Sequence, residues 1–316
     1  MRILITGGAG SLGANIIDHL LPRDGYEILV LDNFATGNRQ SLPEGHDRLT
    51  VVKGSVADKA LVEKCFADFK PTHVIHSAAA YKDPDDWEED AQTNVLGSIY
   101  VAKAAEAAGV KRLVNFQTAL NFGRPAIVPI PNDAPSAPFT SYGISKTAGE
   151  QVMLMANLNT VSLRLANITG PRLAIGPIPT FYTRLKAGKG CFCSDTVRDF
   201  MHMDDFIAIL DKALDENGPK GEFNVSTGEG KSIKDVFDQV VAYLGVELDG
   251  DVPIMPVGDD DVQAMVLDPS VTEKAFDWKA KVSFEDTIRK MLEWYDAHGV
   301  TAIYSHVRVP PKTEVR

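Results

Sequence analysis

A tyrosine and a lysine stand four residues apart, at Tyr142 and Lys146. On a helix these positions share one face, so we expect the two side chains to lie together. An ammonium beside a phenol stabilises the phenolate, and we expect Lys146 to lower the pKa of Tyr142 from about 10 toward neutrality. Tyr142 would then act as a general acid or base. Thr118, at the end of an earlier apolar run, carries a hydroxyl that can share the transferred proton.

A glycine-rich turn, T-G-G-A-G-S-L-G, follows the first apolar run and supports a catalytic role for Tyr142 and Lys146. Glycines between a strand and a helix allow a tight turn and let the backbone approach a pyrophosphate closely. The N–H groups at the start of the helix are free to bind the phosphates. The pattern predicts a dinucleotide site whose contacts in the turn are Gly7, Gly10, Ser11, Leu12 and Gly13.

Asp32 ends the second apolar run, 19 residues after Gly13. A carboxylate there accepts hydrogen bonds from ribose hydroxyls and repels a 2′-phosphate, so we expect NAD rather than NADP. Arg39, in the same loop as Asn33, favours the opposite choice, because an arginine can accommodate a 2′-phosphate. Asp58 has two interpretations of equal weight, a contact near the adenine or a helix N-cap.

The elements that position these residues alternate between short apolar runs and longer amphipathic ones. The runs rich in Val, Ile and Leu predict strands at 3–6, 28–32, 49–54, 73–78, 113–117 and 161–165. The segments between them predict helices near 11–21, 59–69, 88–108 and 141–156. This alternation predicts an α/β fold in which helices cover both faces of a parallel sheet. Ligands bind such sheets at the carboxyl ends of the strands, which is where Thr118 stands.

The pattern loosens after residue 168, where Pro171, Pro177 and Pro179 interrupt the chain. Helical periodicity and short strand candidates then return at 204–216, 223–226, 232–244, 253–257 and 284–297. We expect a first domain at 1–168 and a smaller C-terminal α/β lobe at 169–300, with some segments of the lobe returning to the first domain. Residues 301–316 are expected to form an arm or tail.

Composition narrows the function classes. The 316-residue chain has a net charge of −11 and no run of Lys and Arg, which disfavours nucleic acid as a partner. Three cysteines fit a reducing compartment rather than a disulfide framework. We find no signal peptide and no apolar stretch near the ~20 residues that span a bilayer, so we expect a cytoplasmic protein. His73 and His76 point to opposite faces of a strand, and we expect no metal site.

The glycine turn, the set of Thr118, Tyr142 and Lys146, and the segment R-D-F-M-H at 198–202 together resemble the extended short-chain dehydrogenase/reductase family, in its nucleotide-sugar epimerase/dehydratase branch. The resemblance covers nearly the whole chain and implies a Rossmann-type doubly wound parallel sheet with a substrate lobe. It also implies roles for Tyr142 and Lys146 in binding NAD, with further cofactor contacts at Asn33, Ser55, Val56, Ala78, Ala79 and Asn94. The substrate contacts it implies are Ala80, Lys82, Thr118, Asn167 and Arg198.

At several positions the residue either allows a simpler interpretation or departs from the family pattern. From the residues alone, Lys82 is more simply a solvated lysine, and Arg198 an ion-pair partner of a neighbouring aspartate. Ser55 stands where the family usually has an aspartate that contacts adenine. The segment 255–259 lacks the arginine that usually binds phosphate there, and Arg172 and Lys186 are candidates to replace it.

Ala119 and Leu120 bear on the type of reaction. Sugar 4,6-dehydratases similar to this family carry Asp and Glu at these two positions, and UDP-glucuronate decarboxylases keep a Glu. Neither residue here can transfer a proton, which disfavours both reactions. The resemblance therefore implies a 4-epimerase of a UDP-hexose, UDP-N-acetylhexosamine or UDP-hexuronate, similar to bacterial enzymes of O-antigen sugar biosynthesis.

Three alternatives remain for the activity: a keto-sugar reductase that consumes NAD(P)H, a sugar dehydratase, and a non-enzymatic dinucleotide sensor. The pair of Tyr142 and Lys146 argues against the sensor, because such proteins often lack it. The resemblance also implies a homodimer that pairs the helices near 88–108 and 141–156.

Overall fold

The computed structural model describes residues 1–81 and 83–300, and its larger part is built on a parallel sheet of seven strands. Their order is β3–β2–β1–β4–β5–β6–β11, and every neighbouring pair is parallel. The bounds are β1 (Arg2–Thr6), β2 (Glu27–Asp32), β3 (Leu49–Lys53), β4 (His73–His76), β5 (Arg112–Thr118), β6 (Thr160–Leu165) and β11 (Gly221–Val225). The strand order reverses direction between β1 and β4, which is where an open α/β sheet binds its ligand.

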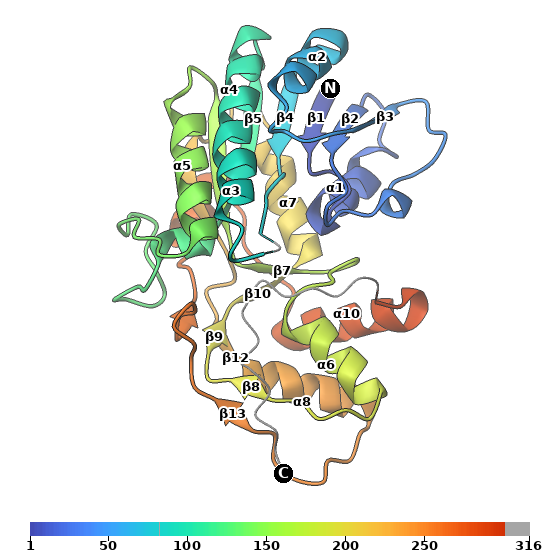
Figure 1. Ribbon diagram of the computed structural model, residues 1–316, viewed down its shortest axis with the longest axis vertical. Coiled ribbons are helices and arrows are strands. Elements are labelled where there is room, and N and C mark those ends of the chain that lie inside the picture. The colour runs from blue at the N-terminus through green and yellow to red at the C-terminus, as the bar shows by residue number, and fades with distance from the viewer. Residues whose placement is uncertain (82, 301–316) are drawn as a thin grey trace.

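Helices cover both faces of this sheet, as Figure 1 shows. On one face α1 (Ser11–Leu20) and α7 (Met203–Ala213) bury their apolar sides in one core cluster. On the other face α2 (Lys59–Phe69), α4 (Gly97–Ala107) and α5 (Ser141–Met155) share a second cluster. The fold is therefore a Rossmann-type doubly wound sheet, which confirms the predicted class.

The helix expected near 88–108 is interrupted. It consists of α3 (Trp87–Asp90), a π-helical turn η2 (Ala91–Leu96) and α4. A Cβ added to Gly149 of α5 would lie 2.4 Å from the Asn94 carbonyl oxygen, so the glycine lets α5 approach this turn closely. Single π turns of this kind occur often at functional sites, and this one places Asn94 at the contact with α5.

The smaller part of the molecule packs three helices around their own core, α6 (Pro177–Lys186), α8 (Ile233–Leu244) and α10 (Phe284–His298). In Figure 1 they lie below the sheet. The short elements are η1 (Arg39–Ser41), η3 (Ala119–Phe122), β7 (Asn167–Thr169), β8 (Cys193–Ser194), β9 (Val197–Arg198), β10 (Phe200–His202), β12 (Lys231–Ser232), β13 (Ile254–Met255), β14 (Ala264–Met265) and α9 (Ser270–Phe276).

One expectation for the second half differs from the structure. Of the three prolines expected to interrupt the chain, Pro177 and Pro179 instead lie in the first turn of α6, because the first turn of a helix needs no N–H from these residues. The strand candidate at 223–226 overlaps β11 (Gly221–Val225), which pairs with β6 as the outer strand of the large sheet. The division at residue 168 stays a prediction, and the arm expected at 301–316 lies outside the described residues.

Across the described residues, no helix combines the length and the apolar character that crossing a bilayer requires. The same residues hold no group of three or more His, Cys, Asp and Glu side chains arranged to ligate a metal ion.

Candidate active site

The glycine turn joins β1 to α1 and lies against the end of β4. Gly7 has a φ of 68°, and a Cβ there would lie 2.7 Å from the Ala78 backbone nitrogen. A Cβ on Gly13 would lie 2.5 Å from the Gly8 Cα, so both positions require glycine. At Gly10 an added Cβ would meet only the Gly7 oxygen at 3.4 Å, so this glycine faces open space.

The start of α1 has the properties of an anion site. Its N-cap is Gly10, which provides no side-chain cap, so the first N–H groups of the helix remain available for phosphate oxygens. The Ser11 hydroxyl donates to the Pro171 carbonyl oxygen at 3.1 Å, and Asn15 donates to the same oxygen at 3.0 Å. These two bonds attach the turn to the segment that leads into the lobe.

Asp32 is buried at the end of β2, and its carboxylate stabilises the turn directly. One oxygen accepts from the Ala9 N–H at 2.8 Å and the other from the Phe34 N–H at 2.7 Å. Burial raises the pKa of this carboxyl group, while the two backbone donors act in the opposite direction. Asn33 is exposed and accepts from the Ala35 N–H, and the guanidinium of Arg39 donates to the Leu42 carbonyl oxygen.

The loop after β3 resolves the two interpretations of Asp58. Its carboxylate accepts from the Leu61 N–H at 3.0 Å and caps α2, so the structure assigns it the N-cap role. The Ser55 hydroxyl accepts from the Ala57 N–H at 3.1 Å, and Val56 is buried against Gly97.

Asn94 holds the loop that follows β4. Its side-chain oxygen accepts from the Ala80 N–H at 2.9 Å, and its amide donates to the Ala80 carbonyl oxygen and to the Ser145 hydroxyl, both at 3.0 Å. The Ser145 hydroxyl in turn donates to the Tyr142 carbonyl oxygen. Asn94 therefore connects the backbone beside the expected nicotinamide site, where Ala78 and Ala79 lie, with the first turn of α5.

Thr118, Tyr142 and Lys146 meet where β5 ends and α5 begins. The Thr118 hydroxyl accepts from the Leu120 N–H at 3.2 Å and lies close enough to the Tyr142 phenol to lower the pKa of that group. The Lys146 ammonium is buried and donates to the Phe116 carbonyl oxygen at 2.7 Å. All three predicted residues are thus brought to the carboxyl end of β5, the edge at which such sheets bind ligands.

The electrostatics of Tyr142 differ from the expectation. Burial raises its pKa above the ordinary value, and the nearby Tyr81 and Asp90 act in the same direction, whereas the hydrogen bond from Thr118 lowers it. The expected lowering by Lys146 is not found, because the ammonium is directed at the Phe116 carbonyl oxygen. Burial also lowers the pKa of Lys146 to about 8, against a smaller opposing effect of Glu150.

The lobe carries the two residues expected to bind the substrate diphosphate. Asn167 is exposed and donates from its side-chain amide to the Asp199 carbonyl oxygen at 3.0 Å. The guanidinium of Arg198 donates to the Val262 carbonyl oxygen at 3.0 Å and forms an ion pair with Asp261. The partner of Arg198 is therefore Asp261, which differs from the neighbouring aspartates considered from the sequence.

The two candidates to replace the missing arginine each form an ion pair with a carboxylate of a neighbouring helix. Arg172 pairs with Asp18 of α1 at 2.6 Å, and Lys186 pairs with Asp296 of α10 at 3.0 Å. Each of these two cations therefore has a carboxylate partner, as Arg198 does. Lys82, expected to contact substrate, lies outside the described residues.

Two residues at the site were not found from the sequence. The ring of Tyr81 packs against that of Tyr142, with centroids 5.9 Å apart. Asp90 is buried, its pKa is raised by burial, and the Ser141 hydroxyl hydrogen-bonds its carboxylate. Asp90 belongs to an acidic run that is typical of a solvated helix start, so the sequence carries no signal of its burial.

Comparisons with known proteins agree with this geometry. The sequence profile described as "NAD dependent epimerase/dehydratase family" matches residues 3–226. The chain belongs to this family. It is 30% identical to a UDP-glucose 4-epimerase of Mycolicibacterium smegmatis, over 93% of this chain and 98% of that protein. It is also 28% identical to a putative UDP-arabinose 4-epimerase of Arabidopsis thaliana, over 94% of this chain and 77% of that protein.

Solved structures show the same fold. The Bordetella bronchiseptica enzyme WbmG, in complex with NAD and UDP, is 67% identical, with a TM-score of 0.93 over 98% of this chain and 99% of that one. WbmH of the same organism, in complex with NAD⁺, is 38% identical, with a TM-score of 0.89 over 95% of this chain and 99% of that one.

The residues of the glycine turn fit the NAD that this family uses. Gly10 leaves space at the uncapped start of α1, where the phosphates would bind, and Asp32 presents a carboxylate at the end of β2 for the ribose. The carboxylate disfavours a 2′-phosphate, which accords with NAD as the cofactor. Beside this turn, the Ala78 N–H donates to the Thr6 hydroxyl and the Ala80 N–H to the Asn94 side-chain oxygen, which fixes the backbone after β4.

Proposed function

We propose that the protein is an NAD-dependent UDP-sugar 4-epimerase, acting in surface polysaccharide (O-antigen) sugar synthesis as the sequence resemblance implies. The observation that carries the proposal is the meeting of Thr118, Tyr142 and Lys146 where β5 ends and α5 begins, with Lys146 one turn after Tyr142 along α5. This arrangement suits the removal and return of a proton on a sugar hydroxyl. The 4-epimerases among its relatives support the same assignment.

The protein's own groups perform the proton transfer. The Tyr142 phenolate takes the proton of the sugar 4-hydroxyl, and the Thr118 hydroxyl, which lies near the Tyr142 phenol, shares it. Lys146, one turn further along α5, would bind the ribose next to the nicotinamide. NAD, when bound, would accept a hydride from C4 of the sugar and, after the 4-keto sugar rotates in the site, return it to the opposite face of C4. Tyr142 then gives the proton back, so the reaction needs no added reductant.

The residues after Thr118 favour epimerisation over dehydration. Ala119 is buried and Leu120 packs beside it in an apolar cluster formed with residues of the lobe. Elimination of water from a sugar requires a group that protonates the leaving hydroxyl and a group that removes a carbon-bound proton. Neither side chain can do so, which supports a reaction limited to the 4-hydroxyl.

The residues that we propose to bind the substrate lie in the lobe. We assign the diphosphate to Arg198, whose planar guanidinium can bind phosphate oxygens in pairs, and to Asn167 beside it. UDP is proposed as the nucleotide because it is bound in WbmG. We place the reaction in the cytoplasm, which accords with the free thiols of Cys65, Cys191 and Cys193.

Proton NMR in D₂O, without added cofactor, tests the proposed function. The purified protein is incubated with UDP-hexoses, UDP-N-acetylhexosamines and UDP-hexuronates in turn. We expect one of them to give its C4 epimer without deuterium, because the hydride never exchanges with solvent. A product deuterated at C3 or C5 would show enolisation and would replace the 4-epimerase with another epimerase or a dehydratase. Turnover that needs stoichiometric NAD(P)H would identify a reductase.

A further inference from the structure

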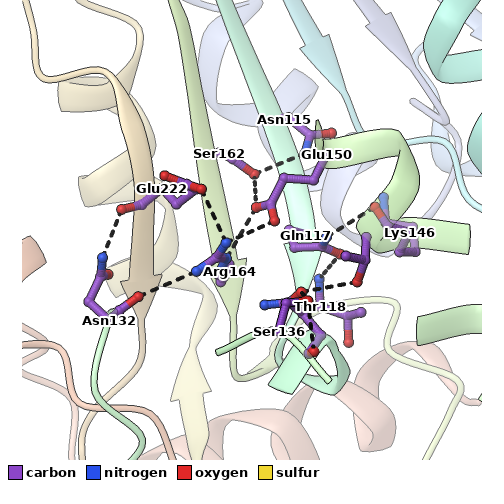
Figure 2. Close-up of polar contacts among 12 residues, drawn as sticks. Asn115, Gln117, Thr118, Asn132, Ser136, Lys146, Glu150, Ser162, Arg164 and Glu222 are labelled. Carbon is purple, nitrogen blue, oxygen red and sulfur yellow. Dashed lines mark hydrogen bonds and ion pairs between the residues drawn. The ribbon is translucent and has the colours of Figure 1, made fainter. Parts of the chain in front are cut away.

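Gln117, the residue before Thr118, makes two hydrogen bonds that have no part in the proton transfer described above. It is buried, 2% exposed, and its side chain lies between β5 and α5 (Figure 2). The side-chain oxygen accepts from the Thr118 N–H at 2.7 Å, and the side-chain nitrogen donates to the Lys146 carbonyl oxygen at 3.0 Å. One amide group therefore bonds the backbones of two of the three expected catalytic residues.

The bond to Lys146 is additional to those that the helix needs. Inside an α-helix the Lys146 carbonyl oxygen already accepts from the N–H four residues on, and its second lone pair takes the Gln117 amide. The bond from Gln117 therefore fixes the position of α5 along the direction of β5. A helix that moved by one residue would shift by about 1.5 Å, which is enough to separate Tyr142 from Thr118.

The contacts of α5 with β5 are made residue by residue. The Lys146 ammonium binds the Phe116 carbonyl oxygen, the Lys146 backbone binds Gln117, and the Tyr142 phenol lies near Thr118. Three consecutive residues of one strand thus meet two residues of one helix turn. Gln117 is the member of this set that contacts both elements by side chain alone, so it can be changed without altering a reacting group.

Other polar contacts hold α5 at different levels, as Figure 2 shows. Glu150 forms a buried ion pair with Arg164 of β6 at 3.0 Å and accepts from the Ser162 hydroxyl at 2.6 Å. The Thr147 hydroxyl donates to the Asn121 side-chain oxygen at 3.0 Å. These contacts keep the helix on the sheet when Gln117 is changed, so its removal is expected to leave the fold intact.

We propose that Gln117 is a positioning residue that sets the distances among Thr118, Tyr142 and Lys146 for proton transfer. This inference rests on the proposed function. Displacement of a reacting group by about 1 Å can cost on the order of a hundredfold in rate. Loss of the two bonds should therefore lower kcat far more than it weakens the binding of NAD and UDP, because Gln117 bonds only backbone atoms of Thr118 and Lys146 and leaves their side chains in place.

The test compares Gln117→Met with Thr147→Val, a control that removes one buried hydroxyl contact from the same helix. We expect Gln117→Met to lower kcat at least tenfold, with KM for the UDP-sugar and NAD retention within about threefold of the wild type. Thr147→Val should leave kcat within about twofold. A proportional loss in both variants would show a general effect on stability, and unchanged kcat in Gln117→Met would overturn the proposal.

A second variant, Gln117→Glu, keeps the acceptor for Thr118 but can donate to the Lys146 carbonyl oxygen only when the new carboxyl group is protonated. The ratio of its kcat to that of the wild type should therefore rise as the pH falls. A ratio independent of pH would contradict the role of the bond to Lys146. This variant also serves if Gln117→Met fails to fold.

One readout does not depend on turnover. Ultraviolet difference titration of the NAD-bound protein, with Tyr142→Phe as the reference, reports the ionisation of the Tyr142 phenol. In Gln117→Met the pKa of Tyr142 should change, because Gln117 holds the backbones of Thr118 and Lys146, the two residues on either side of the phenol. An unchanged titration would overturn the positioning role even if no UDP-sugar reacted, an outcome that would separately refute the proposed function.

Discussion

Asp261 forms an ion pair with Arg198, the arginine that we expect to bind the substrate diphosphate. Both side chains are largely shielded from solvent, with exposed fractions of 15% for Arg198 and 22% for Asp261. Burial lowers the pKa of Arg198, and the charge of Asp261 opposes that effect. The expected phosphate ligand thus already has an anionic partner within the protein, and a diphosphate must compete with a carboxylate for the same guanidinium.

This competition predicts opposite effects for the two partners. Arg198→Ala should raise the Kd for UDP at least tenfold, because a charge-assisted bidentate contact is lost. Asp261→Asn should lower the Kd for UDP severalfold, because the competing charge is gone while the loop keeps a side chain of the same size. Isothermal titration of the NAD-bound protein with UDP measures both. Equal weakening in the two variants would show that the pair is structural and does not compete with UDP.

The second prediction concerns the hydroxyl pair. Tyr142→Phe should lower kcat by about a thousandfold, within the range that general acid–base catalysis contributes, because the group that accepts the proton is removed. Thr118→Val should cause a smaller loss, and Thr118→Ser should retain most of the activity because it keeps the hydroxyl. NAD content, measured after purification, is the control and should be unchanged in all three variants. Full turnover in Tyr142→Phe would refute the mechanism.

Much of this site could be predicted from the sequence because its signals are local. The glycine spacing, Asp32 at a strand end, and Tyr142 four residues before Lys146 each lie within one turn or one helix. Their meeting at the carboxyl end of β5 then follows from the rules of parallel sheets. The six strands of the first half were predictable for the same reason, since each is a short apolar run between turn residues.

The remainder depends on contacts between distant segments. No pattern within α5 indicates that the Lys146 ammonium is directed at Phe116 rather than at Tyr142, or that Asp261 reaches Arg198 across 63 positions. The start of α6 at Pro177 was obscured because proline interrupts most helices but is accepted in a first turn. The π turn that carries Asn94 likewise arises from packing against Gly149.

His76, at the end of β4, provides a prediction for pH dependence. It is fully buried between two hydroxyls, with Nδ1 2.9 Å from the Thr6 oxygen and Nε2 3.2 Å from the Ser98 oxygen. The single proton of the Ser98 hydroxyl is donated to the Asn94 carbonyl oxygen, so Ser98 can only accept from His76. The imidazole is therefore assigned as neutral, with its proton on Nε2. Burial, aided by the charge of Lys146, lowers the pKa of His76 to about 3.

The sign of the effect on stability follows from this shift. Between pH 6.5 and about 3 the unfolded chain binds a proton at His76 and the folded protein does not, so stability falls as the pH falls through this window. We expect His76→Gln to reduce that slope by up to about 1.4 kcal/mol per pH unit. Urea unfolding of the wild type, His76→Gln and the exposed-site control His298→Gln at several pH values measures it. An equal slope in all three proteins would contradict the assignment of His76 as neutral.

The last prediction is the association of two copies of the chain through α4 and α5. Leu96, Ile144 and Met155 are exposed by 41%, 53% and 82% on the helical layer that contains these elements, which lie side by side in Figure 1. A second copy that covers them would remove apolar surface from water.

We expect light scattering to give twice the chain mass of 34.3 kDa for the wild type and the single mass for Ile144→Glu. The control is Ile254→Glu, an equally exposed position at 56% on β13 of the lobe, which should leave the mass doubled. A wild type at the single mass, or loss of the dimer in both variants, would rule out this interface.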